Sequence, residues 1–148
     1  MTAPGVERHS PRRAIPLFWG VSDFKKLEVW RKAHALALDV HRVATRIRGS
    51  DNAPLRSQMI RAALSIPTNI VEGTGQRSGK EFGRFIGFAL NSASELDYHL
   101  IVARDLRLIG ATDFESLSSR TVEVRKMLHA LQNTVLTTPR TPRRQVPA

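Results

Sequence analysis

Carboxylates and histidines are the side chains of this sequence that could perform catalysis. One glutamate falls in each of four segments with helical periodicity: Glu28, Glu72, Glu95 and Glu123. A di-iron bundle presents glutamates in this way, but it also requires Glu-x-x-His on two of its helices. The nearest match is Glu95 with His99, which lies one residue too far along the chain. Cysteine is absent, and neither a nucleophile elbow nor a phosphate-binding loop is present. We therefore expect a protein that is not an enzyme and that binds no metal or cofactor.

Positively charged side chains are the other group with chemical consequences, because they bind phosphates. The chain has 23 Lys and Arg against 13 Asp and Glu, a formal net charge of +10. Residues 24–61 carry nine positive and three negative side chains, whereas residues 62–135 carry eight of each. This asymmetry favours an anionic partner, and nucleic acid is the usual one. Seven side chains on and next to the first helix are the expected phosphate contacts: Lys25, Lys26, Arg31, Lys32, Arg42, Arg46 and Arg48.

The positive charge has two interpretations. In the first, the protein associates with nucleic acid without sequence preference, since nothing identifies a recognition helix. In the second, the charge serves solubility only and the helical surface docks a protein partner. Salt-dependent retention on nucleic acid distinguishes the two, because phosphate contacts release counterions.

Four amphipathic helices must position these residues. Apolar side chains recur at alternating spacings of three and four in four segments, and no segment alternates with a period of two. These segments begin in turn at about Lys25, after Asn52, at Ser78 and at Thr112. The first runs to about Arg48 and the second to about Gly73, with Pro54 in its first turn.

Punctuating residues mark the ends of these helices. Gly49 stands where a C-terminal cap of the first helix belongs. Ser78 and Glu81 have the spacing of a capping box at the start of the third helix. Thr112 is expected to open the fourth helix in the same way. Pro67 lies inside the second helix, where it must remove one backbone hydrogen bond and is expected to bend the helix.

These elements predict an all-α fold, an antiparallel up-and-down four-helix bundle over residues 24–135. The proline-rich ends predict a flexible N-terminal arm over residues 1–23 and a disordered basic tail over residues 136–148. No apolar run approaches the roughly 20 residues that a membrane span requires, and no signal-peptide cleavage site is evident. We expect a cytoplasmic protein that does not contact the membrane.

The second helix is apolar on two sides. A second stripe, separate from the one expected to face the core, consists of Ile60, Leu64 and Val71. A helix that is apolar on two sides is normally buried on both. Only one side can face the core of a four-helix bundle, so a second subunit is the simplest cover for the other. We therefore expect a homo-oligomer.

A polar line at helical spacing separates the two apolar stripes of the second helix: Gln58, Arg61, Ser65, Asn69 and Glu72. The third helix contributes Ser92 and Glu95 to a comparable line. Buried polar groups at such spacing pair with one another, so we expect a structural network. The first pairings to consider are Arg61 with Glu95 or Glu72, and Asn69 with Ser92.

Four segments of the sequence resemble a known bacterial family. The most specific is Ser65-Ile66-Pro67-Thr68-Asn69-Ile70-Val71-Glu72-Gly73. The others, in chain order, are Phe24-Lys25-Lys26-Leu27-Glu28-Val29-Trp30, then Leu55-x-x-Gln58-x-x-Arg61-Ala62-Ala63, then Ser78-x-x-Glu81-Phe82-x-x-Phe85. The chain is similar to small four-helix-bundle proteins encoded within intervening sequences of large-subunit ribosomal RNA genes.

This resemblance carries implications for assembly but not for catalysis. It implies a four-helix bundle that assembles as a homopentamer, and it carries over no catalytic activity or substrate. The accessory proteins of diversity-generating retroelements are similar in shape, and they bind nucleic acid and a reverse transcriptase. Two features depart from the family pattern: His41 replaces a tyrosine usual on the first helix, and the proline-rich, arginine-bearing ends are additional.

Overall fold

The computed structural model describes residues 23–137, and within that range it contains helices and no strand. The elements are a short 3-10 helix η2 (Phe24–Lys26), α1 (Glu28–Thr45), a second 3-10 helix η3 (Ser50–Asn52), α2 (Ala53–Thr74), α3 (Gly79–Asp105) and α4 (Ala111–Thr137). The predicted all-α four-helix bundle is confirmed. The arm and the tail expected beyond the bundle lie outside the described residues, apart from Asp23, Leu136 and Thr137. The last two were predicted to be disordered, but they belong to α4.

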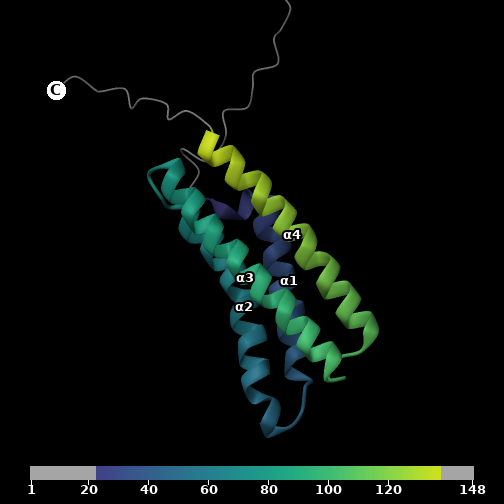
Figure 1. The fold of residues 1–148 in the computed structure, drawn as a ribbon. Helices are drawn as coiled ribbons and strands as arrows, with labels where there is room; N and C mark the ends of the chain where they lie inside the picture. Colours follow the sequence, from purple (N-terminus) through teal and green to yellow (C-terminus); the bar gives the residue numbers. More distant parts are fainter. Residues whose placement is uncertain (1–22, 138–148) are drawn as a thin grey trace, which may run out of the picture.

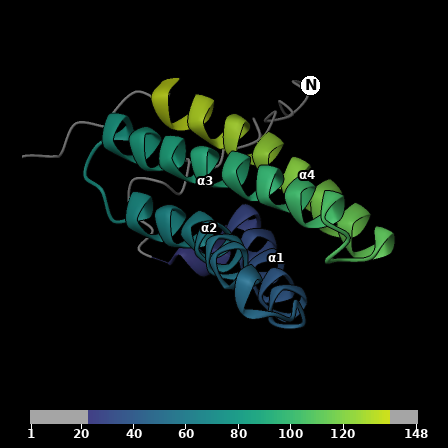
Figure 2. The ribbon, with the colours of Figure 1, turned by 60° about the horizontal axis from the view of Figure 1, so that its bottom comes forward.

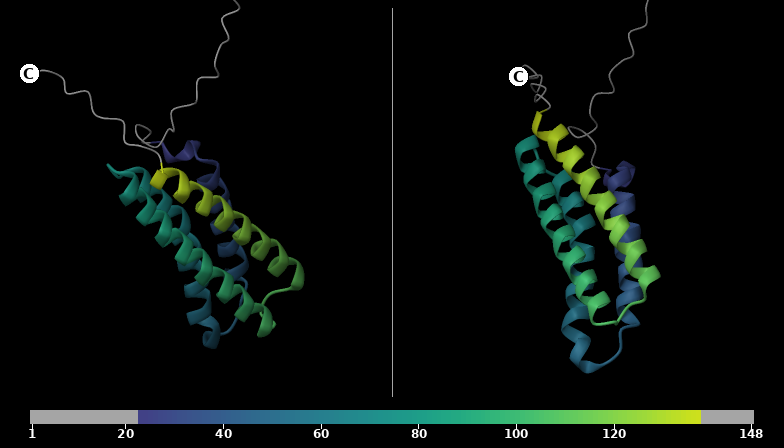
Figure 3. Two further views of the ribbon diagram at one scale, coloured as in Figure 1. Left: turned by 45° about the horizontal axis from the view of Figure 1, so that its top comes forward. Right: turned by 45° about the vertical axis from the view of Figure 1, so that its right-hand side comes forward.

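Consecutive helices run in opposite directions, and the four lie side by side along most of their length (Figures 1 and 3). Figure 2, seen closer to the ends of the helices, shows α1 and α2 as one pair and α3 and α4 as the other. Packing is densest between α2 and α3 and between α3 and α4, and it is sparsest between α1 and α4. The bundle therefore has one loosely packed edge, where α1 meets α4.

The core consists of the apolar stripes that the spacing predicted. On α4, the buried residues recur at alternating spacings of four and three, as expected of a helix with one face in the core: Leu117, Thr121, Val124, Leu128, Leu131 and Val135. On α1, the buried residues recur at alternating spacings of four and three from Val29 to Val43. Removing such a side chain from water contributes about 1.5–3 kcal/mol when burial is complete. Thr121 is the buried polar exception, and its hydroxyl donates to the carbonyl of Leu117 at 2.7 Å.

The first helix ends earlier than predicted. Its regular part stops at Thr45, and the N–H groups of Arg46 and Ile47 then bond three residues back, to Val43 and Ala44. Gly49, the expected cap, lies beyond this point with a φ of 96°, in the left-handed region that favours glycine. The guanidinium of Arg56 donates to the carbonyls of Ile47 and Gly49 at 2.8 and 2.9 Å. An arginine of the next helix thus satisfies carbonyls that the end of α1 leaves open.

Two predicted capping residues have different outcomes. The Ser78 hydroxyl accepts a hydrogen bond from the N–H of Glu81 at 3.1 Å, which confirms one half of the capping box. The carboxylate of Glu81 pairs with Arg84 at 3.3 Å. Thr112 is not the residue before α4, because that helix already begins at Ala111.

Pro67 lies buried inside α2, and the residues that follow it support the interrupted turn. Proline has no N–H to donate to the carbonyl of Ala63 and its ring crowds that carbonyl. In the same turn, the Thr68 hydroxyl donates to the carbonyl of Leu64 and the Asn69 amide donates to that of Ser65, both at 2.8 Å. Side-chain donors thus supplement the backbone bonds immediately beside the missing one.

Candidate nucleic-acid interface

The structure divides the seven predicted phosphate contacts into two groups. Lys32 pairs with Glu123 of α4 and, at 3.7 Å, with Glu28, and Arg42 pairs with Asp39. The other five are exposed and form no ion pair within residues 23–137: Lys25, Lys26, Arg31, Arg46 and Arg48. Two of the seven cations are therefore already in ion pairs within the bundle, and five are available to an outside anion.

The five available cations lie at the two ends of α1. Lys25 and Lys26 belong to η2, and the guanidinium of Arg31 donates to the backbone carbonyl of Lys25 at 3.3 Å, so these three occupy one end. Arg46 and Arg48 follow the last turn of α1 at the other end. An 18-residue helix is about 27 Å long at 1.5 Å per residue, which sets the approximate separation of the two groups.

Two ion pairs join charged side chains of α1 to α4. Lys32 pairs with Glu123, and one heptad further along α1, Asp39 accepts a bond from Arg120 at 2.7 Å. We call this line of paired charges the α1–α4 seam. It bridges the edge of the bundle where neighbouring helices contact each other least. One positive and one negative side chain of α1, Lys32 and Asp39, thus contribute to its pairing with α4.

The same pairs favour the charged forms of Asp39 and Lys32. The hydrogen bond from Arg120 lowers the pKa of Asp39 below its ordinary value of 3.8, and Arg42 lowers it further. The hydrogen bond to Glu123 raises the pKa of Lys32 above its ordinary value of 10.5, and Glu28 adds to the effect. Neither Asp39 nor Lys32 therefore releases or takes up a proton near neutrality.

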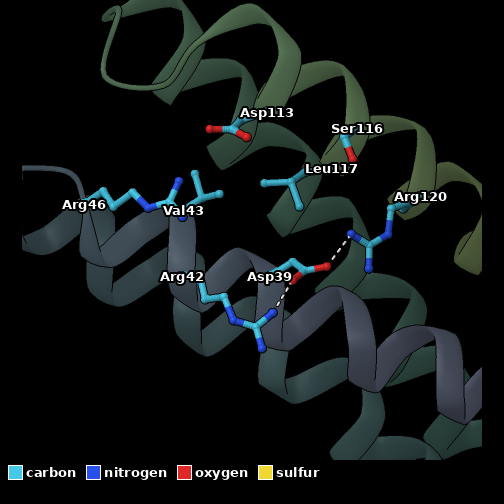
Figure 4. A pocket seen from close by; sticks show the side chains of 8 residues that line it. All are labelled: Asp39, Arg42, Val43, Arg46, Asp113, Ser116, Leu117 and Arg120. Carbon is cyan, nitrogen blue, oxygen red and sulfur yellow. Dashed lines mark hydrogen bonds and ion pairs between the residues drawn. The ribbon is translucent and has the colours of Figure 1, made fainter.

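A pocket of about 180 Å³ opens at the end of the seam, beyond the second ion pair (Figure 4). Its lining comes from α1 with Arg46 just beyond it, and from α4: Asp39, Arg42, Val43, Arg46, Asp113, Ser116, Leu117 and Arg120. In Figure 4, Arg46 and Asp113 lie on facing helices across the pocket, and no ion pair joins them. Arg46 and Asp113 continue the alternation of charges along the seam, but at the pocket no ion pair bridges the two helices.

Within the described residues, only three of the seven members of the predicted polar network are joined, and they meet at one hydroxyl. Ser65 Oγ accepts hydrogen bonds from the Asn69 amide at 3.0 Å and from the Ser92 hydroxyl of α3 at 2.8 Å. Asn69 and Ser92 are therefore linked through Ser65 and not directly. The ion pairs considered for Arg61 are absent from the described part of the chain, and four members of the two lines are exposed: Gln58, Arg61, Glu72 and Glu95. All three joined residues are half-buried, between α2 and α3.

An aromatic series that was not predicted from the sequence lies at the start of α1. The ring of Phe24 meets Trp30 edge to face at 4.8 Å, and Trp30 stacks on His34 at 4.9 Å with an interplanar angle of 7°. The i, i+4 spacing of Trp30 and His34 was the available signal, since such residues are neighbours on a helix surface. The three aromatic side chains share this end of α1 with Lys25, Lys26 and Arg31.

Two further features bear on function: clusters of side chains that could bind a metal ion, and helices that could span a membrane. Over residues 23–137, no three His, Cys, Asp or Glu side chains come together in a way that could bind a metal ion. Among the described helices, none combines the length and the apolar character that crossing a membrane requires.

Comparisons with known proteins agree with this fold. A comparison with curated protein sequences finds no significant match. Among solved structures, the chain is similar to a protein of unknown function from the S23 ribosomal protein family of Bacteroides thetaiotaomicron, with a TM-score of 0.66 and 23% identity. That match covers 70% of this chain and 97% of the other, and at this identity it shows the fold alone. The family model described as 23S rRNA-intervening sequence protein matches residues 25–130, and the chain therefore belongs to the family of 23S rRNA-intervening sequence proteins.

Proposed function

We propose that this protein is a non-enzymatic, oligomeric helical bundle that associates with nucleic acid through the unpaired cations at the two ends of α1. The observation that carries the proposal is the division of charge described above. Lys32 and Arg42 are compensated within the bundle, whereas the cations at both ends of α1 are exposed and have no carboxylate partner among the described residues. Exposed cations of this kind bind phosphates and release counterions, without regard to sequence.

The spacing of the two cation groups suits a polymer. They lie about 27 Å apart along α1, which corresponds to about eight nucleotides of one strand at 3.4 Å each. One strand can therefore contact both groups at once. Binding at the second group is then intramolecular, so two weak sites act together.

Exposed apolar side chains support the oligomeric part of the proposal. Of the second stripe on α2, Leu64 is 44% exposed, while Ile60 and Val71 are half-buried within the protomer. Phe88 on α3 is 39% exposed. A second copy that covers these side chains gains hydrophobic free energy, and a closed ring of copies, with a pentamer favoured, would repeat the cation groups around the assembly. Light scattering tests this part, and a 16.5 kDa monomer at tens of micromolar would contradict it.

The main experiment measures binding to a single-stranded oligonucleotide as a function of salt. Five phosphate contacts, each with a slope of about −0.7, weaken binding about 100-fold between 50 and 200 mM salt. The triple change Lys25→Gln, Lys26→Gln and Arg31→Gln leaves two contacts, and the same change in salt should then weaken binding only about 7-fold.

A matched control separates the local surface from total charge. Arg77→Gln, Arg107→Gln and Lys126→Gln also remove three exposed cations that form no ion pair within residues 23–137, but they lie outside α1, in the two loops that flank α3 and on α4. This control should keep the salt slope of the unchanged protein. Equal slopes for both triple variants would show that α1 is not the binding surface, and no binding at low salt would contradict the proposal as a whole.

A protein partner is the second candidate function, and one surface favours it. Along the last turns of α3, Tyr98 is 63% exposed and Leu106 is 59% exposed, with the half-buried Val102 between them at i, i+4 spacing. Exposed apolar side chains in such a row are typical of a helix that docks another protein. If nucleic acid is not bound at low salt, this stripe becomes the surface to test.

A further inference from the structure

The aromatic series at the start of α1 has the geometry of a stacking surface. Trp30 and His34 are close to parallel, with 7° between their ring planes and 4.9 Å between their centroids. Phe24 also contacts the indole, edge to face with 4.8 Å between the ring centroids. Parallel rings at this separation form a stack that a further ring can extend.

Burial shows which ring is outermost. Trp30 is half-buried and packs against the hydrophobic core, whereas His34 is exposed. The exposed imidazole of His34 therefore stacks on an indole that the bundle holds in place. A ring held in this way loses little conformational freedom when a ligand stacks on it.

The cations beside the series have no competing carboxylate partner. Lys25, Lys26 and Arg31 are exposed and unpaired within residues 23–137. The Lys25 ammonium lies 6.0 Å from the Phe24 centroid, and the Arg31 guanidinium reaches the Lys25 carbonyl at 3.3 Å. Aromatic rings flanked by cations are the combination that single-stranded nucleic acids require, since the bases stack on the rings while the phosphates meet the charges.

We propose that the outer face of the His34 ring, supported by Trp30 and Phe24, stacks an unpaired base of single-stranded nucleic acid. This inference rests on the proposed function and specifies its substrate class. A duplex keeps its bases stacked on one another, so its phosphates can meet the cations but its bases cannot reach the ring. The site therefore prefers unpaired bases and has little preference among them, because every base has a π face.

The experiment compares two 15-nucleotide strands with equal numbers of phosphates, oligo-dT and a fully abasic strand, binding to the full-length protein. Equal phosphate numbers cancel the electrostatic contribution, so the ratio of affinities isolates the bases. Stacking of one base is expected to favour oligo-dT about 5- to 150-fold. His34→Ala should remove this preference and leave the affinity for the abasic strand unchanged, whereas His34→Phe, which keeps a ring without the imidazole nitrogens, should retain the preference.

Two further measurements locate the effect. His41→Ala changes another exposed histidine about two turns further along α1, and it should keep the preference for oligo-dT. The chain has two tryptophans, so a Trp19→Phe background leaves Trp30 as the only indole, and oligo-dT should quench its fluorescence more than the abasic strand does. Circular dichroism should show unchanged helix content in each variant.

Several outcomes would overturn the inference. Equal affinity of the unchanged protein for the two strands would exclude a stacking site and leave the phosphate-binding proposal standing. A preference that survives or increases in His34→Ala, or that is lost in His34→Phe, would show that the ring of His34 is not the platform. Absence of binding to both strands at low salt would overturn the inference and the proposed function together.

Discussion

Ser65 is the residue whose replacement tests the packing of α2 against α3 most directly. Its hydroxyl accepts two hydrogen bonds, from Asn69 at 3.0 Å and from Ser92 at 2.8 Å. Each bond contributes about 0.5–1.5 kcal/mol net, and the donors are half-buried, so Ser65→Ala should lose about 1–3 kcal/mol from these bonds. Alanine also favours helix by up to about 0.5 kcal/mol over serine, which offsets part of the loss.

A control on the same helix removes the helix-propensity contribution. Ser57 lies on α2, is exposed and makes no side-chain hydrogen bond within the described residues. Ser57→Ala should therefore leave the free energy of unfolding unchanged or raise it by up to about 0.5 kcal/mol. The difference between the two variants should be about 1–3 kcal/mol, which at an m-value near 2 kcal/mol/M separates their urea midpoints by roughly 0.5–1.5 M.

The assay is urea unfolding followed by circular dichroism, with all variants at one protein concentration because assembly shifts apparent stability. Ser92→Ala removes one of the two bonds and should lose about 0.5–1.5 kcal/mol. The double variant with Ser65→Ala should lose less than the sum of the two single losses, because the bond between the hydroxyls is counted twice. Equal midpoints for Ser65→Ala and Ser57→Ala would refute the argument and show that solvent satisfies these groups as well as the protein does.

Two further predictions concern charged side chains. The pKa of Asp39 is lowered in the folded state, chiefly by Arg120, so its contribution to stability is present above pH 4 or so and is lost as the pH falls through the lowered pKa; Asp39→Asn should therefore flatten the acid limb of a stability curve measured between pH 2 and 6, and an unchanged limb would contradict the ion pair. Arg61 is exposed and forms no ion pair within residues 23–137, so Arg61→Ala should change the free energy of unfolding by at most about 0.5 kcal/mol, and a larger loss in urea unfolding would indicate a partner in another subunit.

The apolar pattern was sufficient to predict the fold because it depends on local periodicity. Every position of the stripe from Leu117 to Val135 is buried, as its spacing predicted. Pro54 in the first turn of α2 and Ser78 before α3 were also evident, since each acts within a few residues of its own position. The end of the first helix was predicted at Arg48, before Gly49, which is three residues too late. The i to i−3 bonds after Thr45 end the regular helix before the glycine is reached.

The candidate site was only partly predictable because charge compensation depends on contacts distant in sequence. In the sequence, Lys32 and Arg46 are both positively charged residues of the first predicted helix, and nothing there distinguishes them. In the structure, Lys32 pairs with Glu123, 91 residues away, and Arg46 has no ion pair among the described residues. The same holds for the polar line, whose equal spacing concealed that Ser65 faces α3 and that Arg61 does not reach a carboxylate. Counting charges within a segment therefore overestimates the surface that an anion can use.

The α1–α4 seam gives a reason why charged side chains of α1 form ion pairs within the bundle. Lys32, Asp39 and Arg46 follow one another at heptad intervals with alternating sign, and Glu123, Arg120 and Asp113 face them in the opposite order. Sliding α4 by one heptad toward the end of α1 would place Glu123 level with Asp39, two like charges at an edge with little apolar packing to compensate. Alternating charges thus disfavour this misalignment where hydrophobic contact is sparse. The cations that remain available precede the pair of Lys32 with Glu123 or follow the pair of Asp39 with Arg120. The proposed contacts with nucleic acid therefore lie at the two ends of α1.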